Sequence, residues 1–68
     1  MSVEPQRPER FLPLPVVKDL TSMGRNTIYE HIRQGRFPAP VKVGRRSAWP
    51  ESEIARWIEA RKAARSAA

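Results

Sequence analysis

The chain has 68 residues, no cysteine, one histidine and a formal net charge of +6. A chain of this length forms at most one small domain, and its composition excludes disulfides, thiolate metal ligands and a histidine-built zinc site. No stretch is apolar for long enough to span a bilayer or to act as a signal peptide, so we expect a soluble cytoplasmic protein.

Most of the net charge lies in one third of the chain. Between Arg25 and Arg46 there are six cations and one anion, Glu30. These cations surround a turn and a predicted hairpin, whereas a membrane-surface protein would carry them along one long amphipathic helix. The distribution therefore favours a nucleic acid as the partner over a membrane, and a solvated basic surface is the alternative. We expect no small-molecule substrate.

The beginning of the chain predicts a tail and a short helix. Residues 1 to 10 contain two prolines and one aliphatic side chain, Val3, which predicts a disordered tail. Leu12-Pro13-Leu14-Pro15 should be extended, because a residue before proline is pushed out of the α region. A helix is then predicted from about Pro15 to Thr21. Its apolar side would consist of Val16, Val17 and Leu20.

A second helix follows a break in the periodicity. Thr21-Ser22-Met23-Gly24 interrupts the first helix, and its glycine can serve as the N-cap of the next. That helix is predicted from about Arg25 to Gln34 and ended by Gly35, the residue type that adopts the left-handed conformation after a helix. Ile28 and Ile32 lie one turn apart and face the core. Two helices with a short turn between them, the second basic, are typical of a helix-turn-helix.

A hairpin is predicted next. Two prolines in Arg36-Phe37-Pro38-Ala39-Pro40 exclude a helix and a central strand, while the phenylalanine should be buried. From Val41 to Val43 the hydrophobic period changes to two, Gly44-Arg45-Arg46 marks a tight turn, and Ser47-Ala48-Trp49 can return as a second strand. A two-stranded hairpin is unstable alone, so its valine and tryptophan face should lie on the helices. The two arginines would project as a wing.

The chain closes with a third helix. It is predicted to start around Trp49-Pro50-Glu51, with the proline near its first turn and acidic residues at its positive end. Its core-facing stripe would consist of Ile54, Trp57, Ile58 and the stem of Arg61. The predicted fold is mainly α with a small β-hairpin, a winged helix-turn-helix in the order α-α-β-β-α. The domain should span residues 11 to 63, followed by a frayed C-terminus at 64 to 68.

The candidate DNA contacts form two groups. The side chains that suit base reading in the major groove are Arg25, Asn26, Thr27 and Arg33. The side chains expected to contact the DNA backbone are Tyr29, Arg36, Lys42, Arg45, Arg46 and Ser47. Tyr29 could instead only pack, and Glu30 could accept from a cytosine amino group or only be solvated. Adjacent arginines repel each other, and phosphates would relieve that repulsion.

The leading hypothesis is a sequence-specific protein for double-stranded DNA, located at the nucleoid. A protein-interaction module that does not bind DNA is the hypothesis from a different class. We expect no enzyme, metal or cofactor, because the carboxylates are scattered over helix surfaces and His31 should be a surface or boundary residue. No heptad seam is visible, so any homodimer would be weak or induced by DNA.

Several of these runs together resemble a known family. They are Leu14-Pro15-Val16-Val17, Thr27-Ile28-Tyr29, Gly35-Arg36-Phe37-Pro38-Ala39-Pro40-Val41-Lys42-Val43-Gly44, and Trp49 with Glu53-Ile54-Ala55-Arg56-Trp57-Ile58. The pattern resembles the AlpA-type prophage regulators, relatives of the excisionases and of the MerR-type winged-helix fold. The resemblance covers about Phe11 to Arg61.

The resemblance implies a transcriptional regulator of a phage or mobile element. Its second helix would enter the major groove, and its wing would lie on the backbone or in the minor groove. An excisionase-type recombination directionality factor is the alternative that the resemblance leaves open. The family usually has glycine, an aliphatic residue and serine before the second helix, whereas this chain has Ser22-Met23-Gly24.

Overall fold

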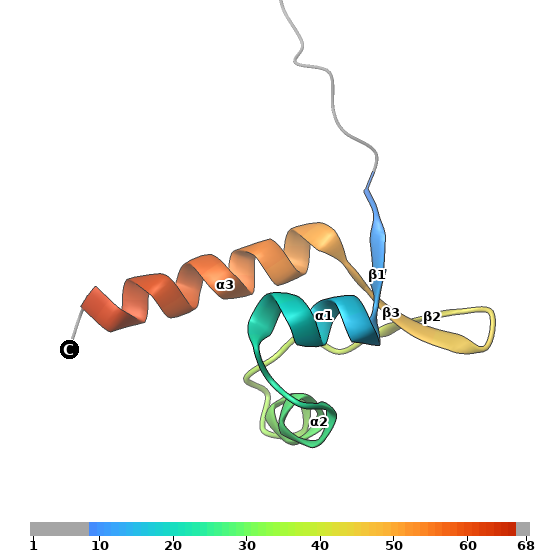
Figure 1. Cartoon of the computed structure of the whole chain (residues 1–68), viewed down its shortest axis with the longest axis horizontal. Helices are drawn as coiled ribbons and strands as arrows, with labels where there is room; N and C mark the ends of the chain where they lie inside the picture. The colour runs from blue at the N-terminus through green and yellow to red at the C-terminus, as the bar shows by residue number, and fades with distance from the viewer. Residues whose placement is uncertain (1–8, 67–68) are drawn as a thin grey trace, which may run out of the picture.

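The computed structural model describes residues 9–66 and shows three helices with a small antiparallel sheet (Figure 1). The elements in chain order are β1 (Phe11–Pro13), α1 (Leu14–Thr21), α2 (Arg25–Arg33), β2 (Val41–Val43), β3 (Arg46–Pro50) and α3 (Glu51–Ser66). The strand order in the sheet is β1-β3-β2. Figure 1 shows the β2–β3 hairpin extending past α1 and α2, as a wing does. The predicted fold class is confirmed.

The sheet has one strand more than predicted. β1 pairs antiparallel with β3, so that Leu12 lies opposite Trp49. Next to the Phe11–Pro50 pair, the Glu51 N–H donates to the Arg10 carbonyl oxygen at 2.8 Å. Pro13 has no N–H to donate, which an edge strand tolerates. The sequence correctly predicts an extended Leu12-Pro13 and the place of Pro15 in the first turn of α1. The extended conformation predicted for Leu14 was wrong, because α1 already begins at this residue.

Most of the predicted N-terminal tail, residues 1 to 8, lies outside the described residues. Glu9 is described, and its carboxylate accepts the Ser52 N–H at 3.1 Å and the Ser52 hydroxyl at 3.0 Å. These hydrogen bonds lower the pKa of Glu9, with a smaller contribution from the charge of Arg56. The start of α3 is thus held by residues just before β1. At the other end α3 continues to Ser66, while residues 67 and 68 lie outside the described part.

Only one of the three apolar residues predicted for the core side of α1 is buried. Val17 is fully buried, whereas Val16 and Leu20 are 38% and 49% exposed. Val16 and Leu20 are four positions apart and share one side of the helix. Val17 lies on the adjacent side, which is the side that faces the core. The predicted stripe was therefore wrong for Val16 and Leu20.

The valines of the hairpin do not share a face with the tryptophan. Val41 lies opposite Ala48 and Lys42 opposite Ser47. Because side chains alternate along a strand, Trp49 shares its face with Ser47, and the valines lie on the other one. Val41 and Val43 are accordingly 42% and 46% exposed. The expectation that they would pack on the helices was wrong. Pro50 is the last residue of β3 and directly precedes α3, near whose first turn it was predicted.

The core is centred on Trp49. Its buried residues are Leu12, Val17, Ile28, Phe37, Ala48, Trp49 and Ile54. Tyr29 and Phe37 meet the Trp49 ring edge-on, with centroid distances of 6.3 and 6.4 Å. The Trp49 indole N–H donates to the Pro38 carbonyl oxygen at 2.9 Å. Ile32, Trp57 and Ile58 pack around this cluster, as predicted for the inner sides of α2 and α3.

Replacing Trp49 by Phe should destabilise the domain by about 2 to 4 kcal/mol, because it leaves a cavity and an unpaired carbonyl oxygen at Pro38. Urea denaturation would measure the change. Val43→Ala is the matched control on the exposed face of the same sheet and should alter stability by about 0.5 kcal/mol or less. Equal effects of the two changes would contradict the central position of Trp49.

The attachment of Glu9 to α3 should depend on pH. A carboxyl whose pKa is lowered by folding stabilises the fold above its unfolded pKa, and this contribution is lost as pH falls through the lowered value. Amide exchange of Ser52 should therefore accelerate in acid, over and above the intrinsic pH dependence of exchange. In Glu9→Gln this additional dependence should be absent, and its persistence would show that another group is responsible.

Candidate nucleic-acid interface

The first turn of α2 presents three of the predicted base-reading residues to solvent. Arg25, Asn26 and Thr27 open the helix and are exposed. Gly24 is the N-cap, as predicted, in an extended conformation with no side-chain hydrogen bond to the helix. The positive end of the helix dipole and the unpaired N–H groups of this turn therefore remain available to an anion.

The Arg25 side chain contacts the core through Tyr29. Its guanidinium lies 5.8 Å from the centroid of the Tyr29 ring. The half-buried Tyr29 ring in turn packs on Trp49. The Tyr29 ring packs on the core, and a contact of its hydroxyl with a phosphate stays a prediction. A rigid aromatic under a guanidinium limits the orientations that the Arg25 side chain can adopt.

The fourth predicted base reader, Arg33, is engaged within its own helix. Its guanidinium donates to Glu30 at 2.7 Å, and the Gln34 side chain donates to the other carboxylate oxygen at 3.1 Å. Both partners of the ion pair are largely exposed, so the pair contributes little to stability. It nevertheless holds the Arg33 guanidinium beside Glu30, three residues earlier in the same helix, so that both side chains have a local partner.

A groove joins the start of α2 to the hairpin. It has a volume of about 530 Å³ and is lined by Pro13, Leu14, Pro15, Arg25, Tyr29, Arg46 and Ser47. Two cations from different parts of the chain therefore meet in one concave site without a carboxylate among the lining residues. A serine hydroxyl and the N-terminal end of α1 border the same space. This combination suits an anion that is held by two guanidinium groups.

The other predicted contacts lie outside this groove. All of them are exposed: Asn26, Thr27, Arg33, Arg36, Lys42 and Arg45. Lys42 is directly opposite Ser47 on the paired strand, so the two share one face of the hairpin. Gly44 has φ of +63° and forms the tight turn that places Arg45 at the tip. His31 is half-buried, with Nδ1 3.0 Å from the Thr27 carbonyl oxygen.

Three lining residues of the groove were not among the predicted contacts. Pro13, Leu14 and Pro15 contribute its apolar wall. The sequence indicated their position only in part, because it places them just before and at the start of the first helix. Their approach to Arg25 and Arg46 depends on the pairing of β1 with β3. A pairing between distant segments leaves no local pattern in the sequence.

Other kinds of site receive no support from the described part of the chain. Within residues 9–66, no group of three or more histidine, cysteine, aspartate or glutamate side chains could hold a metal ion. None of the described helices has the length and apolar character needed to cross a membrane.

Helix, turn, helix and projecting hairpin define a protein of the winged helix-turn-helix class. The chain belongs to the family described as prophage CP4-57 regulatory protein (AlpA), whose model matches residues 10–62. It is also similar to the uncharacterized protein ORF88 of Enterobacteria phage P4, with 47% identity over 58 residues. That match covers 84% of this chain but only 66% of the phage protein. No solved structure matches the chain.

The domain should be more stable when Ser22 and Gly24, in the turn between α1 and α2, are exchanged. Ser22 has φ of +61°, which costs an L-residue about 1 kcal/mol, while the Gly24 N-cap makes no side-chain hydrogen bond. We expect Ser22→Gly combined with Gly24→Ser to raise the unfolding free energy by about 1 kcal/mol in urea denaturation.

Gly35→Ala is a control that should have the opposite effect on stability, because Gly35 has φ of +74°. It should lower the unfolding free energy by about 1 kcal/mol. A destabilised double variant would contradict the conformation of the turn.

Proposed function

We propose that this chain is a sequence-specific double-stranded DNA-binding regulator of a phage or prophage. In this proposal α2 enters the major groove and the β2–β3 hairpin follows the DNA backbone. The observation that carries it is the groove in which Arg25 of α2 and Arg46 of the hairpin face the same space. Membership of a prophage regulatory family supports it independently.

The division of labour follows from the position of each cation. The N-terminal residues of a recognition helix are those that reach base edges. Arg25 and Asn26 occupy that position and can make bidentate hydrogen bonds to guanine and adenine. Arg33 lies in the last turn of α2 and is held by Glu30. We therefore assign base reading mainly to the start of α2.

The hairpin and the connecting segment provide contacts that do not depend on sequence. Lys42, Arg45 and Arg46 are exposed on or beside a short turn, where side chains can follow the phosphates. Arg36 is exposed between α2 and β2, at the other end of the recognition helix from Arg25. One α2 and one wing cover a single half-site, so two copies would bind neighbouring half-sites, associating weakly or only on DNA.

Single substitutions should separate the two roles. Arg45→Ala should weaken binding to every sequence alike and lower the slope of log affinity against log salt by about 1. Arg25→Ala and Asn26→Ala should each cost about 1 to 3 kcal/mol on the cognate site only. Fluorescence anisotropy with duplexes from the DNA flanking the gene and with random duplexes, over a range of salt, measures both quantities.

Arg56→Ala is the matched control, since it removes one exposed cation of α3 that does not line the groove of Arg25 and Arg46. It should leave specific binding close to that of the unaltered chain. Equal losses on cognate and random DNA for Arg25→Ala, Asn26→Ala and Arg45→Ala would contradict the assignment. No binding of any duplex at low salt would contradict the proposed function itself.

A further inference from the structure

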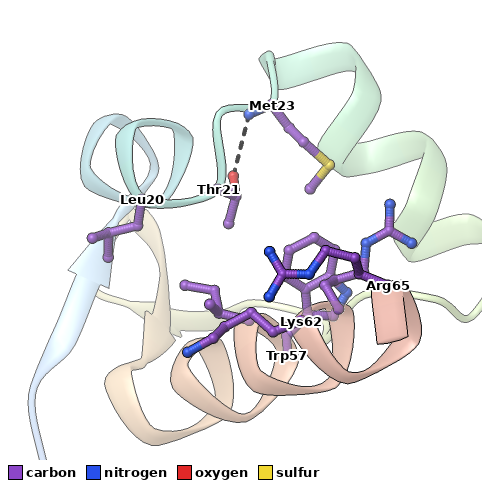
Figure 2. A pocket seen from close by; sticks show the side chains of 8 residues that line it. Leu20, Thr21, Met23, Trp57, Lys62 and Arg65 are labelled. Carbon is purple, nitrogen blue, oxygen red and sulfur yellow. Dashed lines mark hydrogen bonds between the residues drawn. The ribbon is translucent and has the colours of Figure 1, made fainter. Parts of the chain in front are cut away.

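A second groove lies on another side of the molecule, between the end of α1 and the second half of α3 (Figure 2). Its volume is about 330 Å³. The apolar residues that line it are Leu20, Met23, Trp57 and Ile58. Figure 2 shows Met23 pointing from the turn toward α3, across the space from Trp57. An apolar floor is therefore open to solvent here, and Leu20 is 49% exposed.

The edge of this groove is basic. Arg61, Lys62 and Arg65 line it from α3, and none of its lining residues is acidic. Lys62 has one ion pair, with Glu59 at 3.0 Å, in which both side chains are largely exposed. Arg61 lies 5.4 Å from the centroid of the Trp57 ring. Among residues 9–66, no carboxylate forms an ion pair with Arg61 or Arg65.

The apolar floor is held in place by hydrogen bonds. The Thr21 hydroxyl donates to the Val17 carbonyl oxygen at 2.7 Å and accepts the Met23 N–H at 3.4 Å. The Trp57 indole N–H donates to the Arg36 carbonyl oxygen at 2.9 Å, so the polar edge of the ring is already paired. A floor that is fixed before binding loses little conformational entropy when an apolar group covers it.

This groove is separate from the candidate DNA interface. The two grooves share no lining residue. In Figure 1 the tip of the hairpin and the C-terminal end of α3 lie at opposite ends of the molecule. The cations near the C-terminal end of α3 are thus far from the cations of the hairpin tip.

We propose that the α1–α3 groove docks an acidic segment of a partner protein. The segment inserts one bulky apolar side chain between α1 and α3 and places carboxylates beside Arg61, Lys62 and Arg65. Charge complementarity selects this occupant, because a DNA backbone would use the cations but leave the apolar floor uncovered. A second copy of the chain related by a two-fold axis would bring the same three cations face to face.

The test is a selection of random peptides on the full chain, with duplex DNA in excess to cover the other basic surface. Selected peptides should combine aspartate or glutamate with leucine, phenylalanine or tryptophan. For such a peptide, Leu20→Ser and Arg65→Glu should each raise the Kd about tenfold in fluorescence anisotropy. Arg45→Glu makes the same charge change on the hairpin as Arg65→Glu makes on α3, and it should leave the peptide Kd unchanged.

Other results would overturn the proposal. They are the selection of no peptide, of peptides without acidic residues, or of peptides that Arg45→Glu weakens as much as Arg65→Glu does. If Arg65→Glu reduces DNA affinity as strongly as Arg45→Glu, the α3 cations bind phosphate and the groove is not a protein site. If sedimentation shows self-association that Leu20→Ser abolishes, a second copy is the occupant. If no duplex binds, the comparison of Arg65→Glu with Arg45→Glu still shows which basic surface a selected peptide uses, so the two proposals fail independently.

Discussion

Two indole N–H groups hold the segment that joins α2 to the hairpin of this domain. Trp49 of β3 donates to the Pro38 carbonyl oxygen and Trp57 of α3 to that of Arg36, both at 2.9 Å. The connecting segment contains two prolines and cannot form a regular ladder of its own. Phe37 lies between the two bonded carbonyls and meets both tryptophan rings edge-on. The position of α2 relative to the hairpin, and so the α2–hairpin groove, depends on these contacts.

In this domain the apolar side chains form the core and the charged side chains lie on the surface. Among residues 9–66 no charged side chain is buried, and the three ion pairs are exposed. Exposed pairs contribute little to stability, so apolar packing around Trp49 supplies most of it. The cations of α2, the hairpin and α3 are exposed, and among them Arg33 and Lys62 pair with carboxylates of their own helices. A small protein of this charge can carry two distinct basic surfaces without weakening its core.

The helices and turns were predictable because their signals are local. Pro15 at the start of α1, Gly24 before α2 and Gly35 after it each act through the backbone conformation of one residue. The inner sides of α2 and α3 follow from apolar residues one turn apart, as at Ile28 and Ile32. In α1 the same reasoning failed, because a helix of two turns has neighbouring apolar sides and periodicity cannot say which one meets the core.

The sequence by itself determined the helix-turn-helix, the wing, the basic character of both, and the exposure of every charged residue proposed to contact DNA. Only the tertiary structure decided that β1 joins the sheet, that Val41 and Val43 face away from Trp49, and that Arg25 and Arg46 share a groove. It also placed Leu20 and Met23 beside the cations of α3. The physical reason is the same in each case. Strand register and the meeting of distant segments are set by long-range pairing and core packing, which no window of neighbouring residues contains.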